Sequence, residues 1–136
     1  MKVFLDTNVL ISAFATRGLC ADLLRVILAE HELLTGEVNL LELRRVLRDR
    51  FKAAPAQIAQ VETLLRDQTV VPRPELVLSL KVRDVDDAWV LASAVFGSAD
   101  MLVSGDQDLL VLASAAPLPI LTPRAAWERL REDGAA

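Results

Sequence analysis

The sequence predicts an α/β fold built on a mainly parallel sheet. Short apolar segments alternate along the chain with longer segments whose apolar residues recur every three or four positions, and this alternation is typical of parallel sheets. The chain has 136 residues, of which 53% are hydrophobic and 25% are charged, which suits one domain with a buried core. We therefore expect a single domain over residues 1–136, with residues 133–136 frayed at the C-terminus.

The first half of the chain contains three expected strands and four expected helices. Apolar runs that stop at polar or turn-forming residues predict strands, at 3–5, 32–35 and 70–71. Amphipathic spacing predicts helices, at 7–14, 20–30 and 37–51. Pro55 fits the first turn of a fourth helix, whose apolar stripe is Ile58, Val61, Leu64 and Leu65. If part of this stripe is exposed, it would suit a homodimer or a protein partner.

The second half repeats the alternation. Strands are expected at 101–103 and 120–121, and helices at 84–96, at 109–114 and from Pro123 to about residue 132. Thr122 followed by Pro123 is the pattern of an N-cap and a first helical position. We expect the two tryptophans, Trp89 and Trp127, to lie in the core.

Acidic residues follow two of the predicted strands. Asp6 comes directly after the first strand, and Asp106 comes two residues after the strand at 101–103. Parallel strands end at one edge of a sheet, where such folds bind their ligands, so these two acids can share one crevice. Further acids lie at the start of the helix before that strand, within the helix at 37–51 and beside Asp106; they are Asp84, Asp86, Asp87, Glu42 and Asp108. Taken singly, each fits an N-cap, a dipole partner or a solvated surface, and the ordered set is harder to explain in that way.

A divalent cation would explain why carboxylates gather. Like charges repel at close range, and a cation removes that conflict. Carboxylates without Cys or His partners suit Mg²⁺ or Mn²⁺, and one or two such ions can act on a phosphodiester bond. The single Cys20 and the single His31 make a thiolate site or a histidine-based mechanism a poor match.

At this level of detail the chain resembles the PIN-domain ribonucleases, in particular the VapC-like toxins of bacterial toxin–antitoxin pairs. The resemblance rests on the segments at 3–10, 40–43, 84–94, 99–106 and 109–110 and spans residues 1 to about 122. It implies a three-layer α/β/α PIN-like (5′-nuclease-like) fold with about five short strands. It also implies an endoribonuclease that leaves a 3′-hydroxyl and a 5′-phosphate, a cognate antitoxin and a homodimer.

The resemblance also assigns roles to individual residues. The family's four catalytic acids, which are also its metal ligands, fall on Asp6, Glu42, Asp87 and Asp106. Asp6 would touch the metal directly, Asp87 and Asp106 would complete the cage partly through water, and Glu42 would hold a metal-bound water. Asp84, Asp86 and Asp108 are further candidates, and helical register favours Asp87 over Asp86. The residues that would orient the carboxylates are Thr7, Asn8 and Ser104.

The net charge of −4 argues at first against an RNA partner. Seven of the 19 acids are the site candidates above, and the other 12 set against 15 Lys and Arg leave +3. A basic cluster that follows Glu42 could track RNA phosphates or could be a solvated surface; it comprises Arg44, Arg45, Arg48, Arg50 and Lys52.

Two alternatives remain open at this stage. A receiver-like Mg²⁺-binding signalling domain also uses strand-end acids, but it needs a lysine after a late strand, and the lysines are Lys2, Lys52 and Lys81. A PIN-like RNA-processing or binding module outside a toxin–antitoxin system is the other. The sequence lacks an apolar run of the roughly 18 residues that a membrane helix needs and a signal-peptide pattern, so we expect a cytoplasmic protein without a membrane partner.

Overall fold

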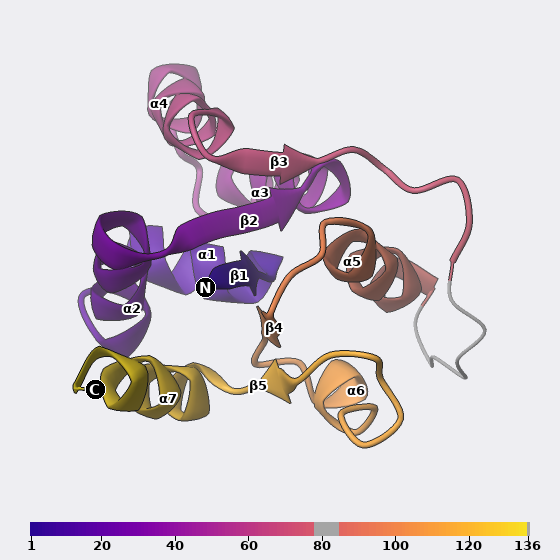
Figure 1. The fold of residues 1–136 in the computed structure, drawn as a ribbon. Helices are drawn as coiled ribbons and strands as arrows, with labels where there is room; N and C mark the ends of the chain where they lie inside the picture. The colour runs from indigo at the N-terminus through magenta and orange to yellow at the C-terminus, as the bar shows by residue number, and fades with distance from the viewer. Residues whose placement is uncertain (78–84, 136) are drawn as a thin grey trace.

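A five-stranded sheet forms the centre of the computed structural model (Figure 1), which describes residues 1–77 and 85–135, with side chains up to residue 132. The strands are β1 (Lys2–Leu5), β2 (Glu32–Gly36), β3 (Thr69–Val71), β4 (Met101–Val103) and β5 (Ile120–Leu121). Their order is β3-β2-β1-β4-β5, and all four pairings are parallel. The prediction of an α/β fold on a mainly parallel sheet is confirmed.

Helices cover both faces of the sheet. They are α1 (Thr7–Ala15), α2 (Leu19–Glu30), α3 (Glu37–Asp49), α4 (Pro55–Arg66), α5 (Val85–Phe96), α6 (Gln107–Leu110) and α7 (Pro123–Ala135). In β1, Val3 and Leu5 pack with α1, α2, α3, α4 and α7, whereas Phe4 between them packs with α5 and α6. Successive strand residues point to opposite faces, and here both faces are buried. The chain is therefore a three-layer α/β/α structure, as expected.

Local capping explains where several helices begin. The carboxylate of Asp6 accepts a hydrogen bond from the backbone N–H of Thr7 and caps α1. Thr122 accepts from the N–H of Ala125 at the start of α7, which matches the expected N-cap. Because α7 continues to Ala135, it runs past the end at residue 132 that the sequence suggested.

The helix expected at 109–114 is the clearest error of position. Asp106 caps α6 through the N–H of Asp108, so the helix begins at Gln107 and ends at Leu110. Beyond it, the N–H of Leu112 bonds the carbonyl of Leu109 in a tighter turn. The cap set by Asp106 shifts the helix toward the N-terminus, which apolar spacing alone does not reveal. Residue 84, where α5 was expected to begin, lies outside the described residues.

The order of the strands reverses beside β1. Strand β1 pairs with β2 on one side and with β4 on the other, so the chain extends the sheet from β1 first in one direction and then in the other, an arrangement that leaves a crevice at the carboxyl ends of the strands. A flavodoxin-like receiver has the order 2-1-3-4-5, which differs from the order seen here. The receiver alternative therefore does not fit the topology.

The apolar stripe of α4 is only partly covered. Ile58 and Leu65 are buried, Val61 is half-buried, and Leu64 is exposed.

Within residues 1–77 and 85–135, no helix has the length and apolar character needed to span a bilayer.

Candidate active site

Asp6 lies at the carboxyl end of β1, where the strand order reverses. It is 4% exposed, and its carboxylate accepts four hydrogen bonds. One oxygen accepts from the N–H of Thr7 at 2.8 Å and from Nδ2 of Asn39 at 3.1 Å. The other accepts from Nδ2 of Asn8 at 3.0 Å and from Oγ of Ser104 at 2.8 Å. A carboxylate has about four lone-pair sites, so a direct metal bond to Asp6 would replace one of these donors.

Burial raises the pKa of Asp6 above its ordinary value, and the charge of Asp106 raises it further. The hydrogen bonds from Ser104, Thr7 and Asn8 act in the opposite direction, because they stabilise the carboxylate. Thr7, Asn8 and Ser104 thus lie where the sequence placed them, around Asp6. Asn8 and Ser104 also tie the next loop to the site: Oδ1 of Asn8 accepts from the N–H of Gly105 at 2.9 Å, and Oγ of Ser104 accepts from the N–H of Asp106 at 3.0 Å.

Asn39 was not among the sequence candidates. It is fully buried in α3, and its Nδ2 donates to Asp6 and to Oγ1 of Thr7, the latter at 3.0 Å. A polar side chain on the buried face of an amphipathic helix, in line with Leu40 and Leu43, needs a hydrogen-bond partner. That anomaly in the sequence was the available signal for its role.

Glu42 lies three residues further along α3 and is half-buried. Burial raises its pKa, and the charges of Asp6 and Asp86 add to the increase. A hydrogen bond with Thr7 and the charge of Arg45 lower it. These interactions bring Glu42 into the same electrostatic environment as Asp6, as the sequence suggested.

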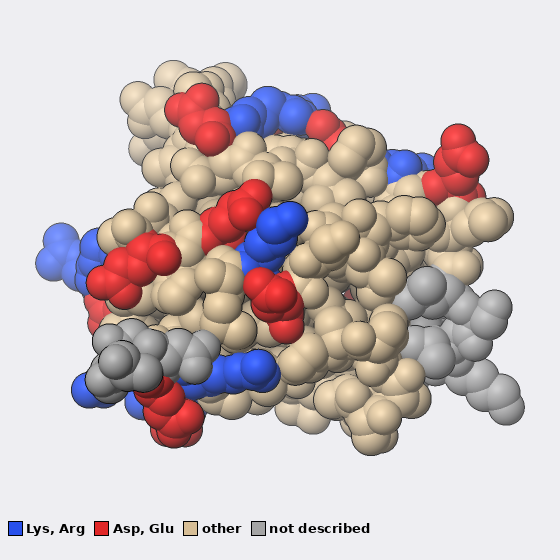
Figure 2. Space-filling model, in the orientation of Figure 1, with Lys and Arg blue, Asp and Glu red and all other residues tan. Residues whose placement is uncertain are grey.

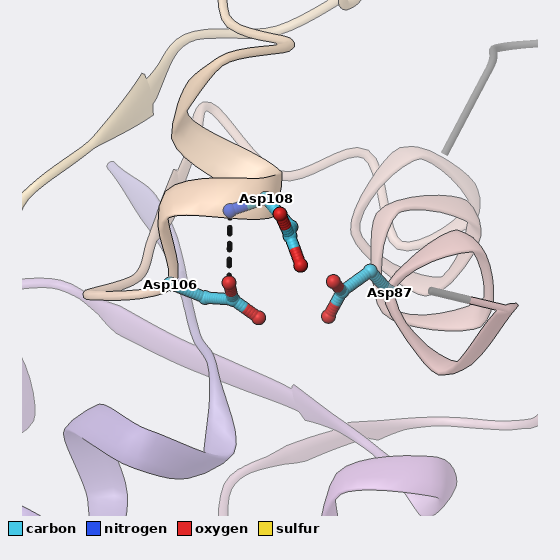
Figure 3. A group of neighbouring side chains, drawn as sticks. All are labelled: Asp87, Asp106 and Asp108. Carbon is cyan, nitrogen blue, oxygen red and sulfur yellow. Dashed lines mark hydrogen bonds between the residues drawn. The ribbon is translucent and has the colours of Figure 1, made fainter. Parts of the chain in front are cut away.

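Three further carboxylates face one another across the gap between α5 and α6 (Figure 3). One ligand oxygen each of Asp87, Asp106 and Asp108 lies within 4.8 Å of the other two. Asp87 is 7% exposed and comes from the first turn of α5, while Asp106 and Asp108 come from the start of α6. In Asp106, one oxygen accepts from the N–H of Asp108 at 2.9 Å, which fixes the orientation of that carboxylate.

This group fits a small divalent cation by its donor set. Three carboxylates in one place, one of them buried, are oxygen ligands of the type that Mg²⁺ and Mn²⁺ prefer. In an octahedral Mg²⁺ site with Mg–O distances of about 2.1 Å, adjacent oxygens lie about 3.0 Å apart and opposite oxygens about 4.2 Å apart. Three carboxylates whose oxygens lie within 4.8 Å of one another are therefore near enough to share one ion once their side chains adjust.

The structure thus divides the sequence candidates into three groups. Asp87, Asp106 and Asp108 lie together, and Asp6 and Glu42 are linked to each other, and Asp6 to Asp106, by charge. The exposed Asp86 lies instead on the cavity described next. Asp84 lies outside the described residues.

A cavity of about 310 Å³ adjoins the acids between α3 and α5. Its walls include Glu42 and Arg45 from α3, Asp86 and Trp89 from α5, and Arg73, which follows β3. The guanidinium of Arg73 lies over the indole of Trp89, 4.3 Å from the ring centroid. The prediction that Trp89 is a core residue is wrong, because its ring is half-buried and faces this cavity. Trp127, by contrast, packs against the core.

The basic cluster after Glu42 divides between different surfaces. Arg44 pairs with Glu62 of α4 at 2.5 Å, and Arg48 pairs with Asp49 at 2.9 Å. Arg45 lines the cavity beside Glu42, and Arg50 and Lys52 are exposed. On the face shown in Figure 2, blue and red side chains lie next to each other at several places, so charge of one sign does not dominate that face.

The protein is thus a three-layer α/β/α protein with an all-parallel sheet, and its carboxylates gather at the carboxyl edge where the strand order reverses. The family model for the PIN domain matches residues 2–108, and the chain belongs to the PIN domain family. PIN domains are generally nucleases that use divalent metals.

Solved structures share this fold over most of the chain. VapBC2 from Rickettsia felis, bound to a DNA fragment from its promoter, matches with a TM-score of 0.60 and 12% identity over 90% of this chain and 98% of that chain. FitAB bound to an IR36 DNA fragment matches with a TM-score of 0.66 and 17% identity over 89% of this chain and 94% of that chain. PAE2754 from Pyrobaculum aerophilum matches with a TM-score of 0.66 and 20% identity over 97% of this chain and 90% of that chain. A comparison with the sequences of curated proteins gives no match.

Proposed function

We propose that this PIN domain is a Mg²⁺- or Mn²⁺-dependent endoribonuclease and the toxin of a type II toxin–antitoxin pair. The observation that carries the proposal is the convergence of Asp87, Asp106 and Asp108 beside Asp6 and Glu42, at the carboxyl edge where the strand order reverses. Such an edge is where open α/β sheets bind ligands, and acids there suit a cation that contacts a phosphodiester.

Each acid has a distinct part in this proposal. Asp87, Asp106 and Asp108 would hold the cation, which when bound supplies an activated water and stabilises the leaving oxygen. Asp6, fixed by its four donors, would set the charge and the orientation of the neighbouring loop. Glu42, whose raised pKa makes it a better proton acceptor, would take a proton from the attacking water at its carboxylate.

The toxin assignment and its partners have separate support. Two of the matching folds come from VapBC2 and FitAB, both solved with DNA fragments. By analogy, this chain would bind a cognate antitoxin and form a homodimer. The partly exposed stripe of α4, with Leu64 at its edge, is a candidate surface for one of these contacts.

The decisive test compares Asp→Asn variants on structured and single-stranded RNAs in Mn²⁺. Asp87→Asn, Asp106→Asn and Asp6→Asn should each lose cleavage by about a hundredfold or more while keeping a wild-type circular dichroism spectrum. EDTA should abolish wild-type cleavage, and the products should carry a 5′-phosphate and a 3′-hydroxyl. Asp67→Asn is the matched control, because Asp67 is exposed and precedes β3, at the opposite edge of the sheet.

Two results would contradict the proposal. Cleavage that survives EDTA would exclude a metal-dependent mechanism, and full activity of Asp87→Asn or Asp106→Asn would exclude these acids as the active site. If the wild type binds RNA but cleaves none, the alternative of a PIN-like binding module would replace the nuclease. For the toxin assignment, the wild type should arrest bacterial growth on expression and Asp87→Asn should not; a small reading frame beside the gene should encode a protein that relieves the arrest.

A further inference from the structure

The cavity between α3 and α5 has the size and composition of a ligand site. At about 310 Å³ it would hold about ten waters of roughly 30 Å³ each, and small-ligand sites begin near that volume. One wall is the half-buried indole of Trp89, and apolar side chains such as Leu41 of α3 add to it. The rest of the lining includes two arginines, Arg45 and Arg73, and two carboxylates, Glu42 and Asp86.

The face of Trp89 already accepts a flat group. The guanidinium of Arg73 lies 4.3 Å from the ring centroid, a distance at which a planar cation stacks on an aromatic ring. A nucleobase has the same requirement for a flat surface, and it can stack on an indole or on a guanidinium plane. Arg73 can therefore either yield its place to a base or cover the other face of the base.

The cavity also lies in the correct place for RNA. Glu42 is part of its wall and also interacts with Asp6 of the acidic site, so a ligand in the cavity lies next to the acids. A nucleotide whose phosphate lies at those acids would have its own base, or that of a neighbour, within reach of Trp89. Arg45, on the same wall, could contact the connecting phosphate.

We propose that this cavity binds one nucleobase of a single-stranded RNA, stacked on Trp89 and bracketed by Arg73, and so helps to select the bond that is cut. The proposal rests on the nuclease function above and adds to it a specificity-determining residue, Trp89. Stacking on an aromatic side chain tolerates every base, so the effect is one of position along the RNA more than of base identity.

The tryptophans make the proposal directly measurable. Trp89 and Trp127 are the two tryptophans, and the chain has no tyrosine. Trp127 lies in α7, where it is half-buried and packs against the core on the other face of the sheet. Trp127→Phe therefore leaves Trp89 as the only indole, and Trp89→Phe leaves Trp127.

The experiment titrates each variant with a short single-stranded oligoribonucleotide in EDTA, so that binding is read without cleavage. Saturable quenching is expected in Trp127→Phe and not in Trp89→Phe, although Trp89→Phe should still bind, because its ring can stack. Trp89→Ala should bind about fivefold to a hundredfold more weakly, as loss of one stacked base predicts.

A second arm locates the base. Oligoribonucleotides with one abasic nucleotide at each position around the cut site are cleaved by wild type and by Trp89→Ala in Mn²⁺. One position should slow the wild type and have no further effect on Trp89→Ala, which is the signature of two groups that act on each other. Trp89→Phe should behave like the wild type, which separates stacking from a folding defect.

Two outcomes would overturn the proposal while leaving the nuclease intact. One is unchanged Trp89 fluorescence when labelled RNA is shown to be bound by its anisotropy. The other is wild-type binding and an unchanged abasic profile in Trp89→Ala, which would leave a side chain of a protein partner as the occupant of the cavity. A wild type that fails to cleave any RNA in Mg²⁺ or Mn²⁺ refutes the nuclease instead, and the fluorescence arm still reads the base site.

Discussion

Removal of the Ser104 hydroxyl should show how much its hydrogen bond to the Asp6 carboxylate stabilises the fold. Ser104 is 0% exposed; its Oγ donates to Asp6 at 2.8 Å and accepts from the N–H of Asp106 at 3.0 Å. A hydrogen bond to a charged group contributes about 1.5–3 kcal/mol and a neutral one about 0.5–1.5 kcal/mol. Because Ser→Ala removes one oxygen and leaves almost no cavity, Ser104→Ala should lower the free energy of unfolding by about 2–4 kcal/mol.

The measurements are urea unfolding, which gives the free energy, and thermal unfolding, which gives Tm, both followed by circular dichroism in EDTA at neutral pH. In a domain of this size, about 4 °C of Tm corresponds to 1 kcal/mol, so Tm should fall by roughly 8–16 °C. Ser93→Ala is the matched control, because Ser93 is also 0% exposed and its Oγ donates to the neutral carbonyl of Trp89 within α5 at 2.8 Å. That substitution should cost about 0–1 kcal/mol.

Equal losses in the two variants would refute the reasoning, since the argument depends on the charged partner of Ser104. A second readout tests the same contact through catalysis. Because the Ser104 hydrogen bond lowers the pKa of Asp6, its loss should raise that pKa. If cleavage requires ionised Asp6, the acidic limb of the pH–rate profile should then move to higher pH in Ser104→Ala, and an unmoved limb would argue against it.

Two further predictions concern α3. Burial raises the pKa of Glu42, so between the ordinary pKa and the raised one the folded chain binds more protons than the unfolded chain, and stability falls as pH rises. Glu42→Gln in EDTA should therefore have a higher Tm than wild type at neutral pH and an equal Tm below pH 4. A lower Tm than wild type at pH 7 would contradict the expected direction of the effect. Arg45 lines the cavity, whereas Arg48 is paired with Asp49. Arg45→Glu should therefore weaken RNA binding at low salt, measured by anisotropy, and reduce the slope of log affinity against log salt concentration by about one or more. Arg48→Glu is the control with a weaker expected effect, and equal effects would indicate a general electrostatic surface.

The fold was largely predictable because its signals are local. Apolar runs that stop at Asp6 or at Pro72 specify strands independently of the rest of the chain. The sequence favoured Asp87 over Asp86 because residues 84 and 87 are one helical turn apart, and the structure brings Asp87 together with Asp106 and Asp108. The roles of these acids in catalysis stay a proposal.

What the sequence did not reveal depends on contacts between distant elements. Asn39 is visible in the sequence as a polar residue on an apolar helix face, but its partner is not; the structure shows that its amide donates to Asp6. Trp89 was expected in the core because large aromatic residues are usually buried. Its half-buried ring instead faces the cavity and lies beneath the guanidinium of Arg73, which is outside any helix, and no periodicity in the sequence encodes that contact.

The sequence separation between Asp6 and its partners also sets when the acidic site can form during translation. Asp6 leaves the ribosome 98 positions ahead of its donor Ser104, and Asp106 follows later still. At about 5–20 residues per second, roughly 5–20 s pass between them. During that interval β1 can pair with β2 but has no β4 beside it. A nascent chain therefore holds an incomplete acid cluster until almost all of the domain has emerged, and the proposed nuclease would be inactive up to that point.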